Sequence, residues 1–306
     1  MERDKALQGW QQPMDRPEYR LIRAGRCAYM VRPGYEDILS EIVPGKTGTD
    51  SVPTDTIGHG RQATTRFPLP GRPGEQGVIR WSSRGTFMKY LLGNIYLTIR
   101  TRMFEEAKVT ARARRHGVPV ADVLAAGRET IAPLLYRGWI VTREIPRCQD
   151  LRLFLETFPD EPSPAQLKRK RDILAAAGTA VAAMHDAGIY HWDLHIRNLL
   201  AVPDGSLEDL VYIIDFDKSK VFHPMRRPTR IRNLMRLFRS LVKRPTVCAH
   251  FTRRDLERFL SAYFRSDRAR RRAANCLIRR HLWIIRLHGL WWRRHGLRSA
   301  LDKYLF

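Results

Sequence analysis

The sequence has no long hydrophobic run. None of its 306 residues lies in an uninterrupted apolar stretch of the roughly 18 to 20 residues that a membrane-spanning helix needs. Residues 1–20 mix both charges and contain no apolar segment, so they do not have the pattern of a secretory signal. We therefore expect no membrane-spanning helix and a cytoplasmic location.

Cysteine and acidic residues are both scarce. The four cysteines lie far apart and form no C-x-x-C pair, which argues against a disulfide framework or a zinc cluster. Only 31 Asp and Glu stand against 55 Lys and Arg, which leaves a formal net charge of +24. This surplus indicates an anionic partner, and nucleic acid, an acidic lipid surface and a phosphorylated substrate all meet that condition.

Strand and turn signals dominate the first half of the chain. Residues 36–76 are rich in Gly, Pro and Thr and predict loops around short strands, and a strand follows at 77–81. Apolar spacing predicts a helix over about 99–116, with Gly117 as its stop. We expect a short helix or loop between this helix and a further strand at 138–145.

The second half is predicted to be mostly helical. Ser163 is suited to a helix N-cap and Pro164 to the first helical position, and the helix runs to about Asp186, with Gly188 just beyond it. A hairpin over residues 199–214 is the one β element expected there. The signals predict a small strand-rich lobe followed by a larger helical lobe.

Residues 191–200 and 213–217 carry the densest chemical signal. Asp193 offers a carboxylate to accept a proton from an attacking hydroxyl, and Asn198, five residues later, offers an amide oxygen that can ligate Mg²⁺. Asp215 adds a second carboxylate at the end of a predicted strand. Phosphoryl transfer depends mainly on positioning and charge neutralisation, so one base and two metal ligands form a minimal apparatus. The spacing therefore predicts phosphoryl transfer from ATP with Mg²⁺.

Two histidines in the same segment allow a different interpretation. His191 and His195 flank Asp193 in an H-x-D-x-H pattern that could ligate a metal ion. Because the sequence shows no third ligand cluster, we favour histidines that orient the loop.

The spacing of these residues resembles the protein-kinase-like superfamily, whose catalytic loop has the pattern H-x-D-L-x-x-x-N and whose metal-binding strand ends in D-F-G. Here the second motif is Asp215, Phe216 and Asp217, so its glycine is missing, and no A-P-E segment follows. These departures fit kinases of small molecules and sugars better than protein kinases. The resemblance implies an α+β, bilobal protein-kinase-like fold with a small strand-rich N-lobe and a larger helical C-lobe.

Within that superfamily the chain most closely resembles the bacterial lipopolysaccharide kinases, and among them the 3-deoxy-D-manno-octulosonic acid (Kdo) kinases. Besides the two motifs above, three stretches carry the likeness, namely 77–85, then 102–106 with 117–120 after it, and 233–243, the last with the pattern N-L-x-R-L-x-R-S-L-x-K. We expect an N-terminal extension with the first strands at 1–57, an N-lobe at 58–146 and a C-lobe at 147–306.

The resemblance also implies a nucleotide site. Glu106 would orient a strand cation onto the phosphates; we prefer Arg80 for that cation, because a guanidinium can bind phosphate bidentately, although the usual residue is lysine. Gly58 and Gly60 keep two glycines of a phosphate-covering loop. Backbone contacts to adenine would come from residues 144 and 145, which are Glu144 and Ile145.

Two of these residues have plainer alternatives. Glu106 could form an exposed helix pair with Arg102, and Arg80 could be a charge at a strand edge. The basic segments 225–243 and 268–294 also need an explanation. The second interleaves Leu, Ile and Trp with Arg at helical spacing, which suits either an amphipathic helix at an anionic membrane surface or an ordinary lobe helix with solvated arginines.

These inferences combine into one expected function. The resemblance implies an ATP- and Mg²⁺-dependent kinase that phosphorylates a Kdo hydroxyl of a lipid-anchored acceptor, the lipopolysaccharide inner core, at the cytoplasmic face of the inner membrane. A heptose kinase of the same family is the first alternative, and a non-catalytic kinase-like module that binds anionic membrane is the second. No helix-turn-helix, finger or RNA-binding motif is present, so we expect no specific nucleic acid partner.

Overall fold

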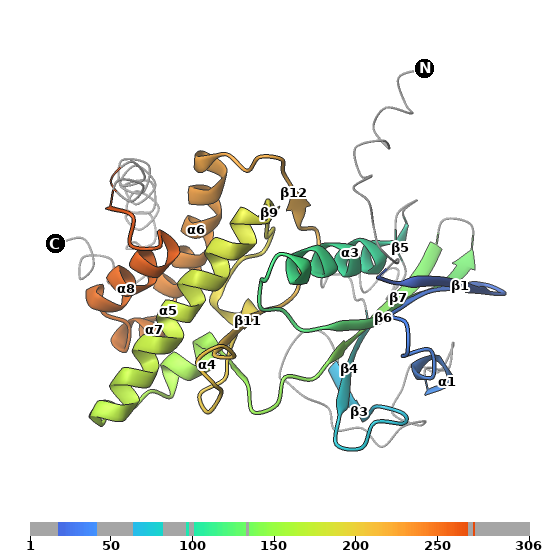
Figure 1. Ribbon diagram of the computed structural model, residues 1–306, viewed down its shortest axis with the longest axis horizontal. Coiled ribbons are helices and arrows are strands. Elements are labelled where there is room, and N and C mark those ends of the chain that lie inside the picture. The colour runs from blue at the N-terminus through green and yellow to red at the C-terminus, as the bar shows by residue number, and fades with distance from the viewer. Residues whose placement is uncertain are drawn as a thin grey trace. The chain divides into compact units, whose positions relative to one another are not determined.

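The computed structural model describes residues 18–41, 64–81, 96–97, 101–132, 135–268 and 272. The chain divides into two compact units (Figure 1). The first comprises Met1–Ile99 and Val123–Thr142, and the second comprises Arg100–Asp122 and Arg143–Phe306. Among the described residues, no helix is both long enough and apolar enough to cross a membrane. The expected lobe limits at 57 and 146 stay a prediction.

An antiparallel sheet forms the first unit. Its strand order is β1-β2-β6-β7-β4-β3, and β5 pairs with β7. A short helix, α1 (Ile38–Glu41), follows the first hairpin. The hydrophobic core of this unit includes the buried side chains of Trp139, Leu124, Phe67 and Val31. The strands are β1 (Arg20–Ala24), β2 (Cys27–Val31), β3 (Thr64–Pro68), β4 (Gln76–Trp81), β5 (Tyr96–Leu97), β6 (Val123–Ala132) and β7 (Leu135–Arg143).

Strand β6 corrects the expectation of a short helix or loop before the strand at 138–145. Its Ala-rich start, with Ala125 and Ala126, favours helix locally. The segment is a strand because it pairs with β2 on one side and β7 on the other, so sheet pairing overrides local propensity. Gly127 is required there, because a Cβ atom would overlap the Trp139 ring on the neighbouring strand.

Helices form most of the second unit. The predicted long helix is confirmed as α5: the Ser163 side chain accepts from the Gln166 N–H in a capping box, and Gly188 ends the segment with φ +79°. Helix α5 packs against α8 over Gly178, where a Cβ atom would overlap the Phe259 carbonyl. The helices are α3 (Arg102–Arg115), α4 (Leu151–Glu156), α5 (Pro164–Asp186), α6 (Arg227–Val242), α7 (Pro245–Ala249) and α8 (Arg253–Tyr263).

Short strands frame the two chemically dense segments. The predicted hairpin is confirmed as β10 (Leu199–Ala201) and β11 (Val211–Ile213), and β8 (Gln149–Asp150) extends it. The structure adds a second ladder, β9 (Ile189–Tyr190) with β12 (Lys220–Val221), so the hairpin is not the one β element of this half. Residues 191–198, called here the 191–198 loop, therefore connect β9 to β10, and residues 214–219, the 214–219 loop, connect β11 to β12.

A buried ion pair joins α5 to α8. The Lys170 Nζ lies 2.8 Å from the Asp255 Oδ2, and the two side chains are 6% and 7% exposed. The same ammonium donates to the His250 carbonyl and lies 4.9 Å from the centre of the Phe158 ring. Removing one partner of such a pair leaves an uncompensated charge in the protein interior.

Replacing Lys170 with alanine is expected to lower the free energy of unfolding by about 3 to 5 kcal/mol, since the Asp255 carboxylate stays buried. Urea unfolding followed by circular dichroism measures the loss. Lys168→Ala is the matched control, because its pair with Asp172 lies on the exposed face of the same helix and contributes about 0.3 to 0.5 kcal/mol. Equal losses in the two variants would contradict this account of the α5–α8 contact.

Candidate active site

Hydrogen bonds join the 191–198 loop to the end of β11. The Asn198 side chain is 6% exposed, and its Nδ2 donates to the Asp193 carbonyl at 3.0 Å. The Asn198 carbonyl accepts from the Ile214 N–H, also at 3.0 Å, and Ile214 directly precedes Asp215. The structure thus brings the predicted base, Asp193, and the two predicted metal ligands onto two hydrogen-bonded segments. The Asp193 side chain remains 56% exposed.

The donor chemistry of this site fits Mg²⁺. Because the Asn198 Nδ2 donates to the Asp193 carbonyl, the Asn198 Oδ1 is the side-chain atom that would ligate a cation. Mg²⁺ is typically bound by one or two carboxylates together with waters and substrate phosphates. In the described part of the chain, no group of three or more His, Cys, Asp or Glu side chains could hold a metal ion. A zinc-type cluster is therefore not formed by these residues.

Asp215 has an unusual backbone conformation. Its φ is +64°, in the left-handed region that Asp and Asn tolerate better than most other residues. Lys218, three residues later, also has a positive φ of 58°. The Ser219 N–H donates to the Phe216 carbonyl at 3.0 Å, which closes a tight turn. The 214–219 loop is thus sharply bent directly after β11.

His191 orients the loop, as the preferred interpretation of the H-x-D-x-H pattern predicts. It is fully buried, its Nε2 donates to the Ile214 carbonyl at 3.0 Å, and its ring packs 5.2 Å from the Phe216 ring. Burial lowers the pKa of His191, so the ring is neutral at physiological pH. The second histidine, His195, places its Nε2 3.5 Å from the Asp193 Oδ2.

Side chains of α6 hold the 191–198 loop through hydrogen bonds to the main chain of that loop. The Asn233 Nδ2 donates to the His191 carbonyl at 2.8 Å, and its Oδ1 accepts from the His191 N–H at 3.2 Å. Two turns further along the same face of α6, the Ser240 Oγ accepts from the Ile196 N–H at 3.0 Å. Asn233 is fully buried, so these bonds are shielded from water.

A basic residue of the same helix face lies beside the predicted base. The Arg236 guanidinium is 3.6 Å from the Asp193 Oδ1, and its side chain is 40% exposed. Asn233, Arg236 and Ser240 are spaced i, i+3 and i+7, which puts them on one side of α6. The family pattern at 233–243 includes these three residues but indicates no role for them. Polar residues at this spacing on an otherwise apolar helix face are the sequence signal that could indicate such a role.

The polar network continues into the core. His185 is fully buried; its Nδ1 accepts from the Tyr263 hydroxyl at 2.7 Å, and its Nε2 donates to the Asn233 Oδ1 at 3.0 Å. Burial lowers the pKa of His185 to about 4, so this side chain is neutral at pH 7. The network therefore links α8, α5 and α6 to the main chain of His191.

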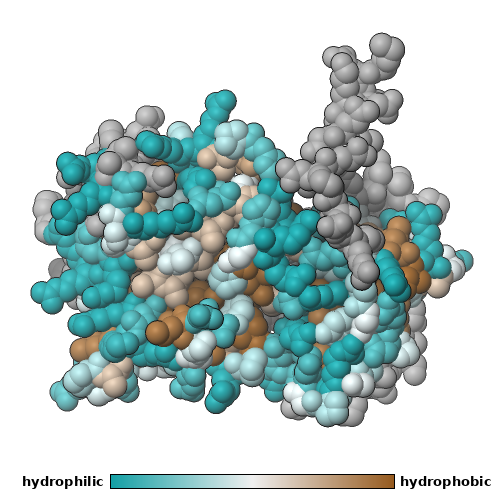
Figure 2. Space-filling view, in the orientation of Figure 1, coloured by the Kyte–Doolittle hydropathy of each residue, from teal (hydrophilic) through white to brown (hydrophobic). Residues whose placement is uncertain are grey.

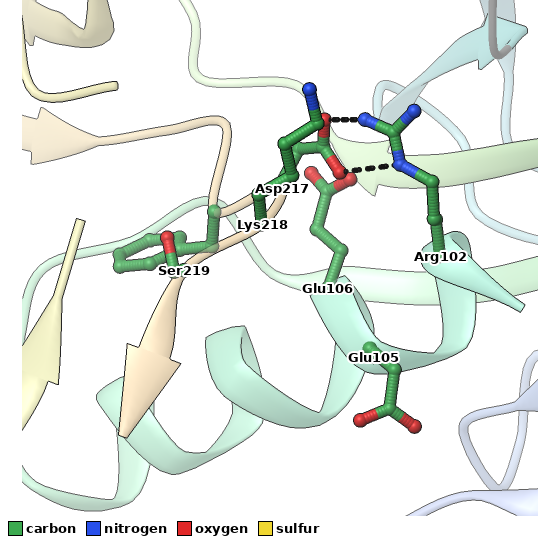
Figure 3. A pocket seen from close by; sticks show the side chains of 7 residues that line it. Arg102, Glu105, Glu106, Asp217, Lys218 and Ser219 are labelled. Carbon is green, nitrogen blue, oxygen red and sulfur yellow. Dashed lines mark hydrogen bonds and ion pairs between the residues drawn. The ribbon is translucent and has the colours of Figure 1, made fainter. Parts of the chain in front are cut away.

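Glu106 lies on the buried face of α3. It is 5% exposed, so the alternative of an exposed helix pair is wrong. Glu106 lines a pocket of about 220 Å³ together with other residues of α3 and residues of the 214–219 loop. Figure 3 shows these side chains. In this pocket the Arg102 guanidinium donates to the Asp217 carboxylate. The lining residues are Arg102, Glu105, Glu106, Phe216, Asp217, Lys218 and Ser219.

The remaining predicted nucleotide residues lie in other segments of the chain. Arg80 is half-buried on β4 and pairs in register with Thr64. Because β4 lies between β7 and β3, Arg80 is not on an edge strand of the sheet. Glu144 and Ile145 follow β7 and are half-buried. Gly58 and Gly60 lie outside the described residues, as does most of the basic segment 268–294.

The strand-rich unit, the helical unit and the joined 191–198 and 214–219 loops define a protein-kinase-like phosphotransferase. The model of the lipopolysaccharide kinase (Kdo/WaaP) family matches residues 63–263, and the chain belongs to this family. The predicted family, fold class and enzyme class are thereby confirmed.

Several relatives show how the similarity is distributed. The 3-deoxy-D-manno-octulosonic acid kinase of Vibrio cholerae is 32% identical over 193 residues, which cover 61% of this chain and 74% of that protein. The lipopolysaccharide core heptose(I) kinase WaaP of Pseudomonas aeruginosa is 29% identical over 53% of this chain and 59% of its own length. A solved structure of WaaP in complex with acyl carrier protein has a similar fold, with a TM-score of 0.51 and 24% identity over 74% of this chain and 85% of that chain.

Proposed function

We propose that this protein transfers the γ-phosphoryl group of ATP to a hydroxyl of a Kdo residue in the lipopolysaccharide inner core. The observation that carries the proposal is that the 191–198 loop is hydrogen-bonded to Ile214, the residue directly before Asp215. It holds one carboxylate, one amide oxygen and a second carboxylate on adjoining segments, as phosphoryl transfer requires. Similarity to Kdo kinases supports the acceptor.

Each residue has a distinct part in the proposed reaction. Asp193, exposed and flanked by His195 and Arg236, accepts the proton of the acceptor hydroxyl. The Asn198 Oδ1 and the Asp215 carboxylate hold Mg²⁺. When bound, ATP would supply the phosphoryl group and leave as ADP, and Mg²⁺ would neutralise the negative charge of the phosphates. The His191 side chain donates to the Ile214 carbonyl, and the Asn233 side chain donates to the His191 carbonyl. These two bonds hold the loop that carries Asp193.

The rest of the nucleotide site follows the family resemblance. Arg80 binds the phosphates and Glu106 orients it, while Gly58 and Gly60 belong to the loop over the phosphates. Backbone groups of residues 144 and 145 bind adenine. Burial of Glu106 beside the 214–219 loop supports its part in this arrangement.

The charge of the protein supports an anionic acceptor at a membrane surface. The full chain carries a formal charge of +24, and many hydrophilic side chains lie on the face shown in Figure 2. Exposed arginines are present on α6 and at the start of α8, including Arg232, Arg239, Arg253 and Arg254. Such side chains attract the anionic groups of lipopolysaccharide and of the cytoplasmic leaflet of the inner membrane.

An acceptor comparison tests the proposal. Lipid A that ends in Kdo, and the same lipid extended by heptose, are each incubated with the protein, ATP and Mg²⁺, and the phosphorylated sugar is located by fragment mass. We expect phosphate on Kdo with the first acceptor. Phosphate on heptose alone would move the function to the heptose kinases that the chain also resembles. Absence of transfer to both acceptors would reject the kinase assignment for lipopolysaccharide sugars.

A further inference from the structure

Asp217 occupies the position where the resembled D-F-G motif has glycine. Its carboxylate meets the guanidinium of Arg102, in the first turn of α3, in a two-pronged contact: Nε donates to Oδ1 at 3.1 Å, and Nη2 donates to Oδ2. The Arg102 and Asp217 side chains are 30% and 22% exposed. Two-pronged guanidinium–carboxylate pairs fix orientation as well as distance. This contact therefore ties two segments that lie 115 residues apart in the sequence.

The loop that Asp217 belongs to is conformationally demanding. Asp215 and Lys218 both have positive φ angles, which non-glycine residues adopt only where the surroundings enforce them. The Ile214 N–H is held by the Asn198 carbonyl and the Ser219 N–H by the Phe216 carbonyl. Between these two main-chain bonds, the Asp217 side chain attaches the loop to Arg102. A glycine at this position has no side chain and could not form this contact.

Glu106 lies one helical turn after Arg102 on α3. Arg102 and Glu106 are spaced i, i+4 on α3, so their side chains lie on the same face of the helix. Figure 3 shows both residues directed toward the 214–219 loop, with the two hydrogen bonds between Arg102 and Asp217 drawn. Fixing Arg102 to Asp217 therefore also fixes the position of Glu106 relative to Asp215.

We propose that Arg102 and Asp217 are positioning residues that latch α3 to the 214–219 loop and so hold Asp215 and Glu106 in their working arrangement. The role rests on the proposed function, since it gives the latch a reaction to serve. A different role for Asp217, as a further ligand of Mg²⁺, is less favoured because both of its carboxylate oxygens are engaged by Arg102.

Hydrogen exchange tests the latch without nucleotide or acceptor. The variants Arg102→Gln and Asp217→Asn each keep a side chain of similar size but remove the charge pair. We expect amide exchange of residues 214–221 to be about 10-fold faster in each, with an unchanged melting temperature, because the pair is partly exposed. The double variant should exchange no faster than either single one. Arg102→Lys, which keeps the charge but not the fork, should give an intermediate rate.

Kinetics provide the second readout. In the full-length protein with ATP and Mg²⁺, each single variant should lower kcat about 10-fold and raise the Mg²⁺ concentration needed for half-maximal rate, while the KM of the acceptor stays unchanged. The charge-swapped variant Arg102→Asp with Asp217→Arg should recover part of both losses. Lys168→Gln, which breaks the exposed Lys168–Asp172 pair of α5, is the matched control and should change neither readout.

The outcomes separate the latch from the proposed function. Unchanged exchange of residues 214–221 in both single variants overturns the latch, as does a double variant whose rate change equals the product of the single ones. A loss of Mg²⁺ affinity in Asp217→Asn that Arg102→Gln does not share also overturns it, in favour of a metal ligand. If the wild-type protein transfers no phosphate, the proposed function fails, and the exchange rates still decide on the latch.

Discussion

Asp193→Asn is expected to lower kcat for phosphoryl transfer about 1,000-fold, within the range observed when a positioned general base is removed. The amide has the shape of the carboxylate but cannot accept the proton of the acceptor hydroxyl. The Asp193 side chain is 56% exposed and its backbone carbonyl, which accepts from Asn198, is unchanged in the variant. The fold and the KM for ATP should therefore remain close to those of the wild type.

The measurement is the rate of ADP release at saturating acceptor, together with a melting curve. Asp172→Asn is the matched control, because it removes a carboxylate from the exposed face of α5 in the same unit. It should retain the wild-type rate. A kcat for Asp193→Asn within about 3-fold of the wild type would show that Asp193 is not the base, since a base contributes at least about 100-fold.

Asp215→Asn is expected to lower kcat/KM for ATP about 100-fold and to raise the Mg²⁺ requirement. The substitution removes the negative charge of the proposed cation site and leaves two amide oxygens, which are weaker ligands. Asparagine also tolerates the left-handed backbone at this position, so the φ of +64° need not change. Asp215→Ala lacks this tolerance and would mix a backbone effect with the loss of the ligand.

Initial rates measured over a range of Mg²⁺ concentrations check this expectation. Asp204→Asn, in the exposed connection between β10 and β11, serves as the control and should follow the wild-type curve. The loss in Asp215→Asn should be partly recovered at high Mg²⁺. A curve that coincides with that of the wild type would remove Asp215 from the metal site.

Local signals were sufficient where one segment determines its own structure. The N-cap Ser163 with Pro164 after it predicted the start of α5, and the residue spacing around Asp193 and Asn198 predicted the site segments. The hairpin β10–β11 was also predicted, because a tight turn and two apolar runs define it locally. In these cases propensity and pattern agree with the final fold.

Other features depend on partners that are distant in the sequence. Strand β6 has helix-favouring alanines and becomes a strand only through β2 and β7. The two-residue strands β9 and β12 exist because Tyr190 pairs with Lys220 and Ile189 with Val221, partners that are far apart in the sequence. Sequence patterns do not identify such pairings.

The site shows the same division. The roles of Asn233 and Ser240 require knowledge that one face of α6 meets the 191–198 loop. The partner of Asp217 is in the first turn of a helix that precedes it by 115 residues. From the sequence, Asp217 was only a departure from a motif; with Arg102 beside it, the departure has a physical explanation.

The most direct test of the central claim is the mass of the acceptor after incubation of Kdo-bearing lipid A with ATP, Mg²⁺ and the wild-type protein or Asp193→Asn. We predict that the wild type adds the mass of one phosphate, on a Kdo hydroxyl, and that Asp193→Asn adds none in the same time. Equal phosphate addition by both proteins would contradict the role of Asp193 in the reaction. An unmodified acceptor in both reactions would contradict the proposed transfer itself.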